Sequence, residues 1–345
     1  MADRSGSWFE VAESQRVAAA LRGMRAFRHL TVDHVAALAT LGHERVISPR
    51  EVVFLEGEDT DGFSALAAGG VEVSRHTSVG PQLVGRLGDG DLVGELGFLD
   101  GAPRDATVSA ILPSRMLHFP TGAVRYLMGE DPGFSLALLR MFWSSLGTKL
   151  RQTNEFLARI MTPSTDRLEP LAGRSGERLR LDVAAKREVL REQGLSTLEL
   201  DLLASVMRAE RFPPEAVILS EGEWSRVLYV VAEGRVTVSR RLPGYGEERL
   251  AVLGRGEVFG EMSIVEDQPR SADVCAAEEG CAVLSIDRTR LEEVFARDRE
   301  TGCQFAELVC RVLARRVRSM NDLLVSWRVL AGEDEWPAGS TSGQT

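Results

Sequence analysis

The sequence predicts an α+β protein, mainly β, that consists of two copies of one domain. Its 345 residues are enough for two domains of ordinary size. Residues 45–58 return in similar form at 211–223, and residues 87–96 return at 253–262. Corresponding positions stay 165 to 167 residues apart along the chain. A nearly constant offset indicates a duplicated domain whose loops differ by single residues.

Each copy has the same order of patterns: a helix, several short strands and a long helix. The first helices are expected at 30–41 and 195–207, the latter with a capping-box pattern of Ser196 and Glu199. Short apolar runs that are broken by glycine are typical of β-strands. The expected strands of the first copy are 51–57, 69–76, 82–88 and 106–119, and those of the second are 216–222, 227–234, 235–241, 249–254 and 273–286.

The long helix at the end of each copy carries apolar residues at alternating spacings of four and three. This heptad seam favours packing of helix on helix over packing on the domain's own sheet. Two arrangements are open: an intramolecular pseudo-dimer, in which the two long helices pair within one chain, or a homodimer through the same seams. The seam residues are Leu139, Trp143, Leu146, Leu150, Thr153, Leu157 and Ile160, and then Ala306, Cys310, Leu313, Val317, Met320, Leu324 and Trp327.

These patterns divide the chain into five parts. An N-terminal segment (1–17) precedes the first domain (18–161), and a linker (162–180) precedes the second domain (181–330). The linker is expected because residues 162–177 are polar and rich in Pro, Gly and Ser. The last part, 331–345, is a tail that is expected to be disordered.

Composition excludes several classes of function. The formal charge of −10 argues against a nucleic-acid partner, since such proteins usually carry a basic stripe. No signal peptide or membrane-spanning run is visible, so we expect a cytoplasmic protein without a membrane partner. The four cysteines have no C-x-x-C spacing and the five histidines all lie in the other half, so we expect no metal site. No catalytic motif is visible, and we expect no enzyme.

Two similar stretches, 94–108 and 260–274, carry the clearest chemistry. Each begins with a Gly-Glu pair and has an arginine nine residues after the Glu. The turn offers backbone N–H groups to an anion, and the guanidinium of Arg104 or Arg270 matches two oxygens of a phosphate. Ionised Glu95 or Glu261 only accepts hydrogen bonds and therefore needs a hydroxyl donor. A ribose cyclic monophosphate satisfies both requirements.

The repeated pattern resembles the phosphate-binding cassette of the cyclic nucleotide-binding domain family. That family includes bacterial catabolite activator proteins, regulatory subunits of cAMP-dependent protein kinase, and domains of cyclic-nucleotide-gated channels. The resemblance covers roughly two thirds of the chain. It implies two jelly-roll-like β-rolls, each with flanking helices and a long C-terminal helix, and cAMP as ligand, with cGMP as the alternative.

The resemblance also implies roles for single residues. Each Glu would bind the ribose hydroxyl, each Arg and the N–H after it would bind the cyclic phosphate, and a following helix would cap the base. Residues 150–157 resemble the base-contacting helix of catabolite activator proteins at Thr153 and Asn154, where the second copy has Met320 and Asn321. The expected ligand-binding residues are Gly94, Glu95, Leu96, Arg104, Asp105, Ala106, Thr153, Asn154, Gly260, Glu261, Met262, Arg270, Ser271, Ala272 and Asn321.

Asp105 departs from the family pattern, in which Ser, Thr or Ala is usual. A carboxylate about 5 Å from a phosphodiester costs roughly 1–3 kcal/mol. Two orientations are open: the side chain points to solvent and only the N–H meets the phosphate, or the carboxylate weakens binding. Ser271 offers a neutral hydroxyl at the same position. The second site is therefore expected to bind better.

These observations favour a cyclic nucleotide sensor that acts on an unidentified protein partner. A DNA-binding module is disfavoured, because about eighteen residues follow Trp327 and they are acidic. One alternative is a structural or assembly protein whose repeats have lost the ligand. Another is an inhibitor similar to kinase regulatory subunits, which is disfavoured because the N-terminal stretch has no R-R-x-[AST] sequence.

Overall fold

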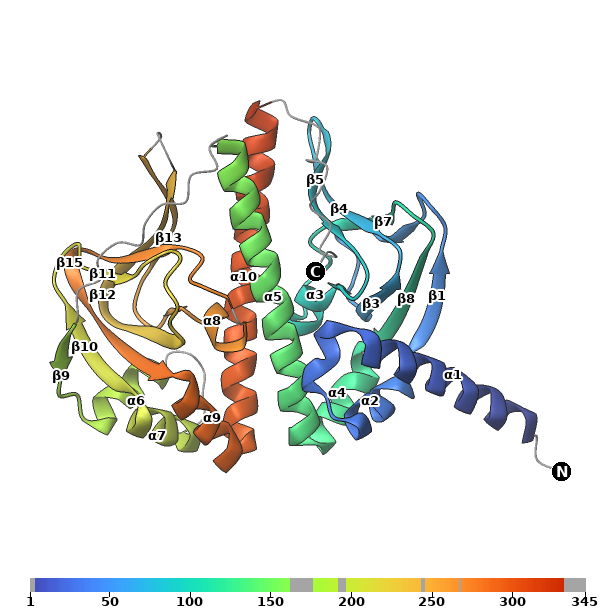
Figure 1. Ribbon diagram of the computed structural model, residues 1–345, viewed down its shortest axis with the longest axis horizontal. Coiled ribbons are helices and arrows are strands. Elements are labelled where there is room, and N and C mark those ends of the chain that lie inside the picture. The colour runs from blue at the N-terminus through green and yellow to red at the C-terminus, as the bar shows by residue number, and fades with distance from the viewer. Residues whose placement is uncertain (1–3, 162–175, 192–196, 243–245, 267, 332–345) are drawn as a thin grey trace. The chain divides into compact units, whose positions relative to one another are not determined.

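The computed structural model describes residues 4–161, 176–191, 197–242, 246–266 and 268–331. The chain divides into two compact units (Figure 1). Unit 1 comprises residues 1–146 together with 313–345, and unit 2 comprises residues 147–312. The divisions fall within two long helices, α5 (Pro132–Met161) and α10 (Arg299–Ala331). Each unit therefore contains the second part of the long helix that follows the other copy.

Unit 1 contains two four-stranded antiparallel sheets. Their strand orders are β1-β8-β3-β6 and β2-β7-β4-β5. Three helical segments precede the strands: α1 (Arg4–Gly23), η1 (Arg25–His29) and α2 (Val32–Ala39). The other elements are β1 (His43–Ile47), β2 (Val52–Phe54), β3 (Gly62–Ala68), β4 (Val71–Thr77), β5 (Gly80–Leu87), β6 (Leu92–Val93), α3 (Glu95–Asp100), β7 (Thr107–Ala110), β8 (Ser114–Pro120) and α4 (Thr121–Glu130).

Unit 2 repeats this order with longer strands. Its main sheet has the order β13-β12-β15-β10-β9, while β11 pairs with β15 and β14 with β12. Two helices, α6 (Val183–Arg191) and α7 (Thr197–Val206), precede most of the strands. The other elements are β9 (Glu177–Leu179), β10 (Arg208–Phe212), β11 (Val217–Leu219), β12 (Val227–Leu242), β13 (Gly246–Leu253), β14 (Val258–Phe259), α8 (Met262–Val265), β15 (Asp273–Asp287) and α9 (Arg288–Arg297).

Each unit buries its own apolar core, which the side chains of its strands supply. In unit 1, Phe63 of β3 has no exposed surface, and its ring contacts those of Phe98, Phe119 and Phe142 at centroid distances of 4.9–5.3 Å. Phe98 lies on α3 and Phe142 on α5. This aromatic cluster therefore fixes α3 against the sheet and the first part of α5.

The predicted α+β fold class, with two β-rich domains and a long helix after each, is confirmed. The structure adds details that the sequence did not predict. Residues 177–179, expected in the linker, form β9 and pair with β10. Residues 227–242 form one strand, because Gly234 takes a φ of 70° and the strand continues past it with a shift of register. Most of the expected linker and tail lies outside the described residues, namely 162–175 and 332–345. Ser196 of the expected capping box lies outside them too.

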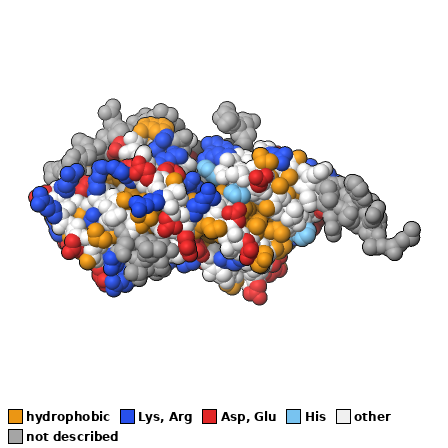
Figure 2. All heavy atoms as spheres, turned by 90° about the horizontal axis from the view of Figure 1, so that it is seen from below, with side chains coloured by type: hydrophobic (Ala, Val, Ile, Leu, Met, Phe, Trp, Pro, Cys, Tyr) orange, Lys and Arg blue, Asp and Glu red, His pale blue; other side chains and the backbone are white. Residues whose placement is uncertain are grey.

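One face of the molecule is mixed in charge. On the face drawn in Figure 2, acidic and basic side chains of the described residues are interspersed. Among the described helices, none is both long and apolar enough to cross a membrane. In that same part of the chain no three His, Cys, Asp or Glu side chains lie close enough to hold a metal ion.

Candidate ligand sites

The first cassette is a tight turn that leads into the short helix α3. Gly94 takes a φ of 82°, which favours glycine, and a Cβ there would collide with Nη1 of Arg104. Glu95, at the start of α3, is fully buried, and Ser145 of α5 donates to its Oε1 at 3.5 Å. Leu96 and Ala106 are also buried. The first cassette therefore buries an acidic side chain at the start of α3.

Arg104 is buried in this turn, with 4% of its side chain exposed. Its Nη1 donates to the carbonyl of Gly94 at 3.0 Å, and its Nη2 donates to Oδ1 of Asp61 at 2.7 Å. The guanidinium lies 4.2 Å above the ring centroid of Phe54. Nε has no hydrogen-bond partner among the described residues. A cation with one unused donor inside a glycine turn is suited to holding an oxyanion.

The backbone holds Arg104 to the turn between β2 and β3. Its N–H donates to the carbonyl of Glu58, and the N–H of Gly57 donates to the carbonyl of Arg104, both at 2.8 Å. Thr60 Oγ1 donates to the carbonyl of Ala102 at 2.9 Å. These hydrogen bonds fix the backbone of Arg104 against the β2–β3 turn.

The second cassette has the same geometry with other partners. Gly260 takes a φ of 73°, and a Cβ there would lie 2.9 Å from Nη1 of Arg270. Glu261 and Met262 are buried at the start of α8, and Ala272 is buried after the arginine. Ser271 Oγ lies 3.6 Å from the sulfur of Met262. The residues that the sequence assigned to each cassette therefore lie together in the structure.

Arg270 makes four hydrogen bonds to described residues, and none of these acceptors is a carboxylate. It donates from Nε to Ser225 Oγ at 3.0 Å and from Nη2 to the carbonyl of Val227 at 2.8 Å. Its Nη1 donates to the carbonyl of Gly260 at 2.8 Å and to Ser263 Oγ at 2.6 Å. Burial lowers the pKa of this guanidinium, although Tyr229, Glu223 and Glu261 oppose that shift. Asp61, which pairs with Arg104 in unit 1, corresponds to Arg226 in unit 2, so the two phosphate arginines differ in their electrostatic surroundings.

The structure assigns the predicted base-facing residues to other units than the sequence analysis expected. Thr153 and Asn154 were assigned to the first copy, but they lie in unit 2 with the second cassette. Arg240 donates to the carbonyl of Asn154 at 2.9 Å, and both side chains of the Thr153–Asn154 pair are buried. Asn321 is buried in unit 1 with the first cassette. The cause is that each long helix begins in the unit of its own copy, while its second part belongs to the other unit.

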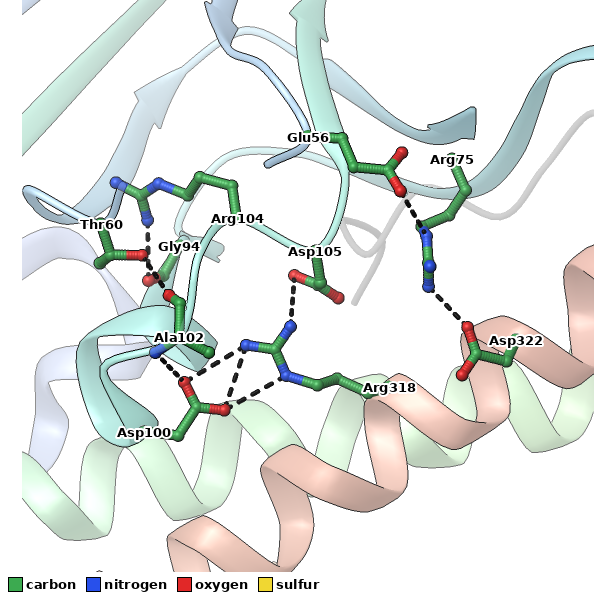
Figure 3. A network of polar contacts seen from close by, with 10 residues as sticks. All are labelled: Glu56, Thr60, Arg75, Gly94, Asp100, Ala102, Arg104, Asp105, Arg318 and Asp322. Atoms are coloured by element: carbon green, nitrogen blue, oxygen red, sulfur yellow. Dashed lines mark hydrogen bonds and ion pairs between the residues drawn. The ribbon is translucent and has the colours of Figure 1, made fainter. Parts of the chain in front are cut away.

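Charged residues that the sequence analysis did not identify connect these helix segments to the cassettes. In unit 1, Arg318 of α10 pairs with Asp100 and Asp105, and Asp322 pairs with Arg75 (Figure 3). In unit 2, Arg151 of α5 pairs with Glu266. Arg151 and Arg318 are 167 residues apart, the same offset as Thr153 and Met320. That offset was the one signal in the sequence that could have identified them as a repeated pair.

Asp105 does not face open solvent. Its side chain is 18% exposed, and its Oδ1 lies 3.7 Å from Nη1 of Arg318. Neither orientation considered from sequence included this partner, because Arg318 lies more than two hundred residues further along the chain.

Comparison with known proteins decides the family. The model of the cyclic nucleotide-binding domain matches residues 44–131 and 209–298, which together are just over half of the chain. The chain belongs to the cyclic nucleotide-binding domain family. Each matched region contains one cassette, so Arg104 lies in the first region and Arg270 in the second.

Two bacterial relatives match part of the chain. The chain is 34% identical over 132 residues to a CRP-like cAMP-activated global transcriptional regulator of Mycobacterium tuberculosis, a match that covers 38% of this chain and 57% of that protein. It is 36% identical over 125 residues to the cyclic AMP receptor protein of Thermus thermophilus, covering 36% and 56%. The chain thus spans little more than half the length of these relatives.

A solved structure is similar over more of the chain. The regulatory domain of Toxoplasma gondii PKA with cAMP matches 92% of this chain and 97% of its own, at 20% identity and a TM-score of 0.32.

Proposed function

We propose that this cyclic nucleotide-binding domain protein senses cAMP and transmits the binding to a protein partner. The observation that carries the proposal is the buried arginine of each cassette, which backbone contacts hold in a glycine turn, together with the buried glutamate of the same cassette. An anion and a neighbouring hydroxyl, as in a ribose cyclic phosphate, complement these two side chains. The two bacterial relatives are named for cAMP, which supports cAMP over cGMP as the ligand.

Titration by isothermal calorimetry tests the ligand. We expect saturable binding of cAMP, with one class of sites lost in Arg104→Ala and the other lost in Arg270→Ala. cGMP titrated in parallel decides the selectivity at each site. The absence of binding by either nucleotide, from a folded full-length chain, would contradict the proposal.

A second candidate function is an assembly protein whose repeats have lost the ligand. Asp61 and Asp105 favour it for unit 1, because one carboxylate pairs with the phosphate arginine and the other directly follows it in the chain. A chain that binds cAMP in unit 2 alone would sense the ligand with unit 2 and use unit 1 for assembly.

A role as a kinase inhibitor would require a partner kinase, and copurification with and without cAMP would identify any such partner.

The long helices are proposed to pair either within one chain or between two chains. Leu146 and Leu313, one from each seam, have no exposed surface. A monomeric mass in sedimentation equilibrium supports pairing within one chain. A dimer that dissociates in Leu146→Asp or Leu313→Asp supports pairing between chains.

A further inference from the structure

Arg318 contacts both ends of the turn that carries the phosphate arginine of unit 1. Its Nη2 lies 3.1 Å from Oδ2 of Asp100, and its Nη1 lies 3.7 Å from Oδ1 of Asp105 (Figure 3). Asp100 ends α3 four residues before Arg104, and Asp105 directly follows Arg104. One planar guanidinium therefore connects the two sides of this turn.

Unit 2 repeats the contact with other atoms. Arg151 donates from Nη2 and Nε to Oε2 of Glu266, at 2.9 and 3.2 Å, and from Nη1 to the carbonyl of Pro269 at 3.0 Å. Glu266 lies four residues before Arg270, and Pro269 directly precedes it. Arg151 thus holds the same turn from a corresponding position of the other long helix. The same contact in both units, made with different acceptors, indicates a built feature of each cassette.

A second contact accompanies each of these arginines. In unit 1, Arg75 of β4 pairs with Asp322 at 2.7 Å, one turn beyond Arg318, and with Glu56 at 3.2 Å. In unit 2, the corresponding Arg240 pairs with Glu221 at 2.9 Å and donates to the carbonyl of Asn154. Each helix segment is therefore anchored at two successive turns.

Only unit 1 has a carboxylate directly after the phosphate arginine. The side chains of Arg318 and Asp105 are 22% and 18% exposed, so their interaction is screened less than that of a surface pair. Without Arg318, the charge of Asp105 would act on an anion held by Arg104. In unit 2 the neutral Ser271 occupies this position and needs no such partner.

We propose that Arg318 is a positioning residue of the first ligand site, which it makes competent for an anion by pairing with Asp105 and holding the turn that carries Arg104. The proposal rests on the proposed binding of cAMP at the cassettes. Since Arg318 belongs to α10, the helix that follows the second copy, cAMP affinity in unit 1 depends on how that helix packs against the first cassette. By linkage, cAMP in unit 1 stabilises this packing to the same extent.

A double-mutant cycle in the full-length chain tests this role. Arg270→Ala is introduced first, so that calorimetry with cAMP reports unit 1 alone. In that background Arg318→Ala is expected to weaken cAMP binding by roughly fivefold to a hundredfold. Adding Asp105→Ser to Arg318→Ala should recover most of the loss, and Asp105→Ser alone should change little. Arg318→Lys, which keeps the charge but loses the fork, should lie between.

The controls separate positioning from general damage. Arg315→Ala removes an exposed arginine of the same helix and should leave cAMP affinity unchanged. The deficit of Arg318→Ala should shrink as salt rises, because Asp105 then acts through a more screened charge. A merely structural role of Arg318 would produce neither the rescue by Asp105→Ser nor this salt dependence.

The outcomes are distinguishable. If the wild-type chain binds cAMP at neither site, the proposed function fails. If unit 1 binds cAMP and Arg318→Ala leaves its affinity unchanged, the positioning role is overturned. Losses that simply add in the double variant overturn the pairing with Asp105.

Discussion

Replacing Asp61 by Asn should strengthen cAMP binding in unit 1. Asp61 Oδ1 lies 2.7 Å from Nη2 of Arg104, the group that we expect to hold the cyclic phosphate. A bound phosphate would therefore lie about 5 Å from a second anion. Unit 2 has Arg226 at the corresponding position, so the effect is specific to unit 1.

The magnitude follows from the exposure of this carboxylate. Two unit charges about 5 Å apart repel by about 1 kcal/mol in water and about 3 kcal/mol at an effective dielectric of 20. Because 72% of the Asp61 side chain is exposed, the lower value applies. Asp61→Asn should thus tighten cAMP binding by about fivefold. Arg104 keeps its bond to the carbonyl of Gly94 and its contact with Phe54, which hold it in place.

Calorimetry in the Arg270→Ala background measures this change, since it reports unit 1 alone. Asp59→Asn, an exposed neighbour in the same turn, is the matched control and should leave the affinity unchanged. The gain from Asp61→Asn should decrease at high salt. A loss of affinity would refute the electrostatic reasoning, because it would mean that Asp61 chiefly orients Arg104 for the ligand.

Three further predictions concern stability and the second site. Arg270→Ala should abolish cAMP binding in unit 2. It should also lower the free energy of unfolding of unit 2 by about 2–4 kcal/mol, because the four hydrogen bonds that the buried guanidinium donates are lost. Urea unfolding without ligand measures this loss of stability, and Arg270→Lys should lose less. Burial raises the pKa of Glu266 above its ordinary value of 4.5, with Arg151 opposing. The ionised form is therefore disfavoured in the folded state, and the stability of unit 2 should fall as pH rises from about 4.5 through the raised pKa. Glu266→Gln should flatten that part of a pH series of urea unfolding, and an unchanged slope would count against the assignment. Phe63→Ala should cost roughly 3–5 kcal/mol in unit 1, because its fully buried ring contacts three others; a thermal unfolding midpoint equal to that of wild type would contradict this.

Local patterns were sufficient for much of the fold. The two cassettes could be predicted because Gly94, Glu95 and Arg104 lie within eleven residues, and a turn with an arginine after a short helix is specified by nearby residues. Their repetition at Gly260, Glu261 and Arg270 argued against a chance match. Most strands followed from apolar runs between glycines, since period and turn chemistry act over a few residues.

Some strands could not be recognised locally. β3, Gly62–Ala68, consists largely of Gly, Ser and Ala, which have little preference for strands. Five of its residues are buried because β3 lies between β8 and β6 in the sheet. Its conformation is therefore imposed by pairing with strands that are distant in sequence. Gly234 was expected to end a strand, but β15 pairs with β12 on both sides of it.

The sequence by itself determined that there are two domains, that each has one cassette, and that each ends in a long helix with an apolar seam. Only the tertiary structure decided which helix segment lies with which cassette. The two seams have the same period and similar residues, so their periodicity does not show which cassette each helix segment contacts. Thr153 and Asn154 therefore lie in unit 2, and Asn321 in unit 1. The pairing of Asp105 with Arg318 likewise depends on contacts between residues far apart in the chain, which no local pattern encodes.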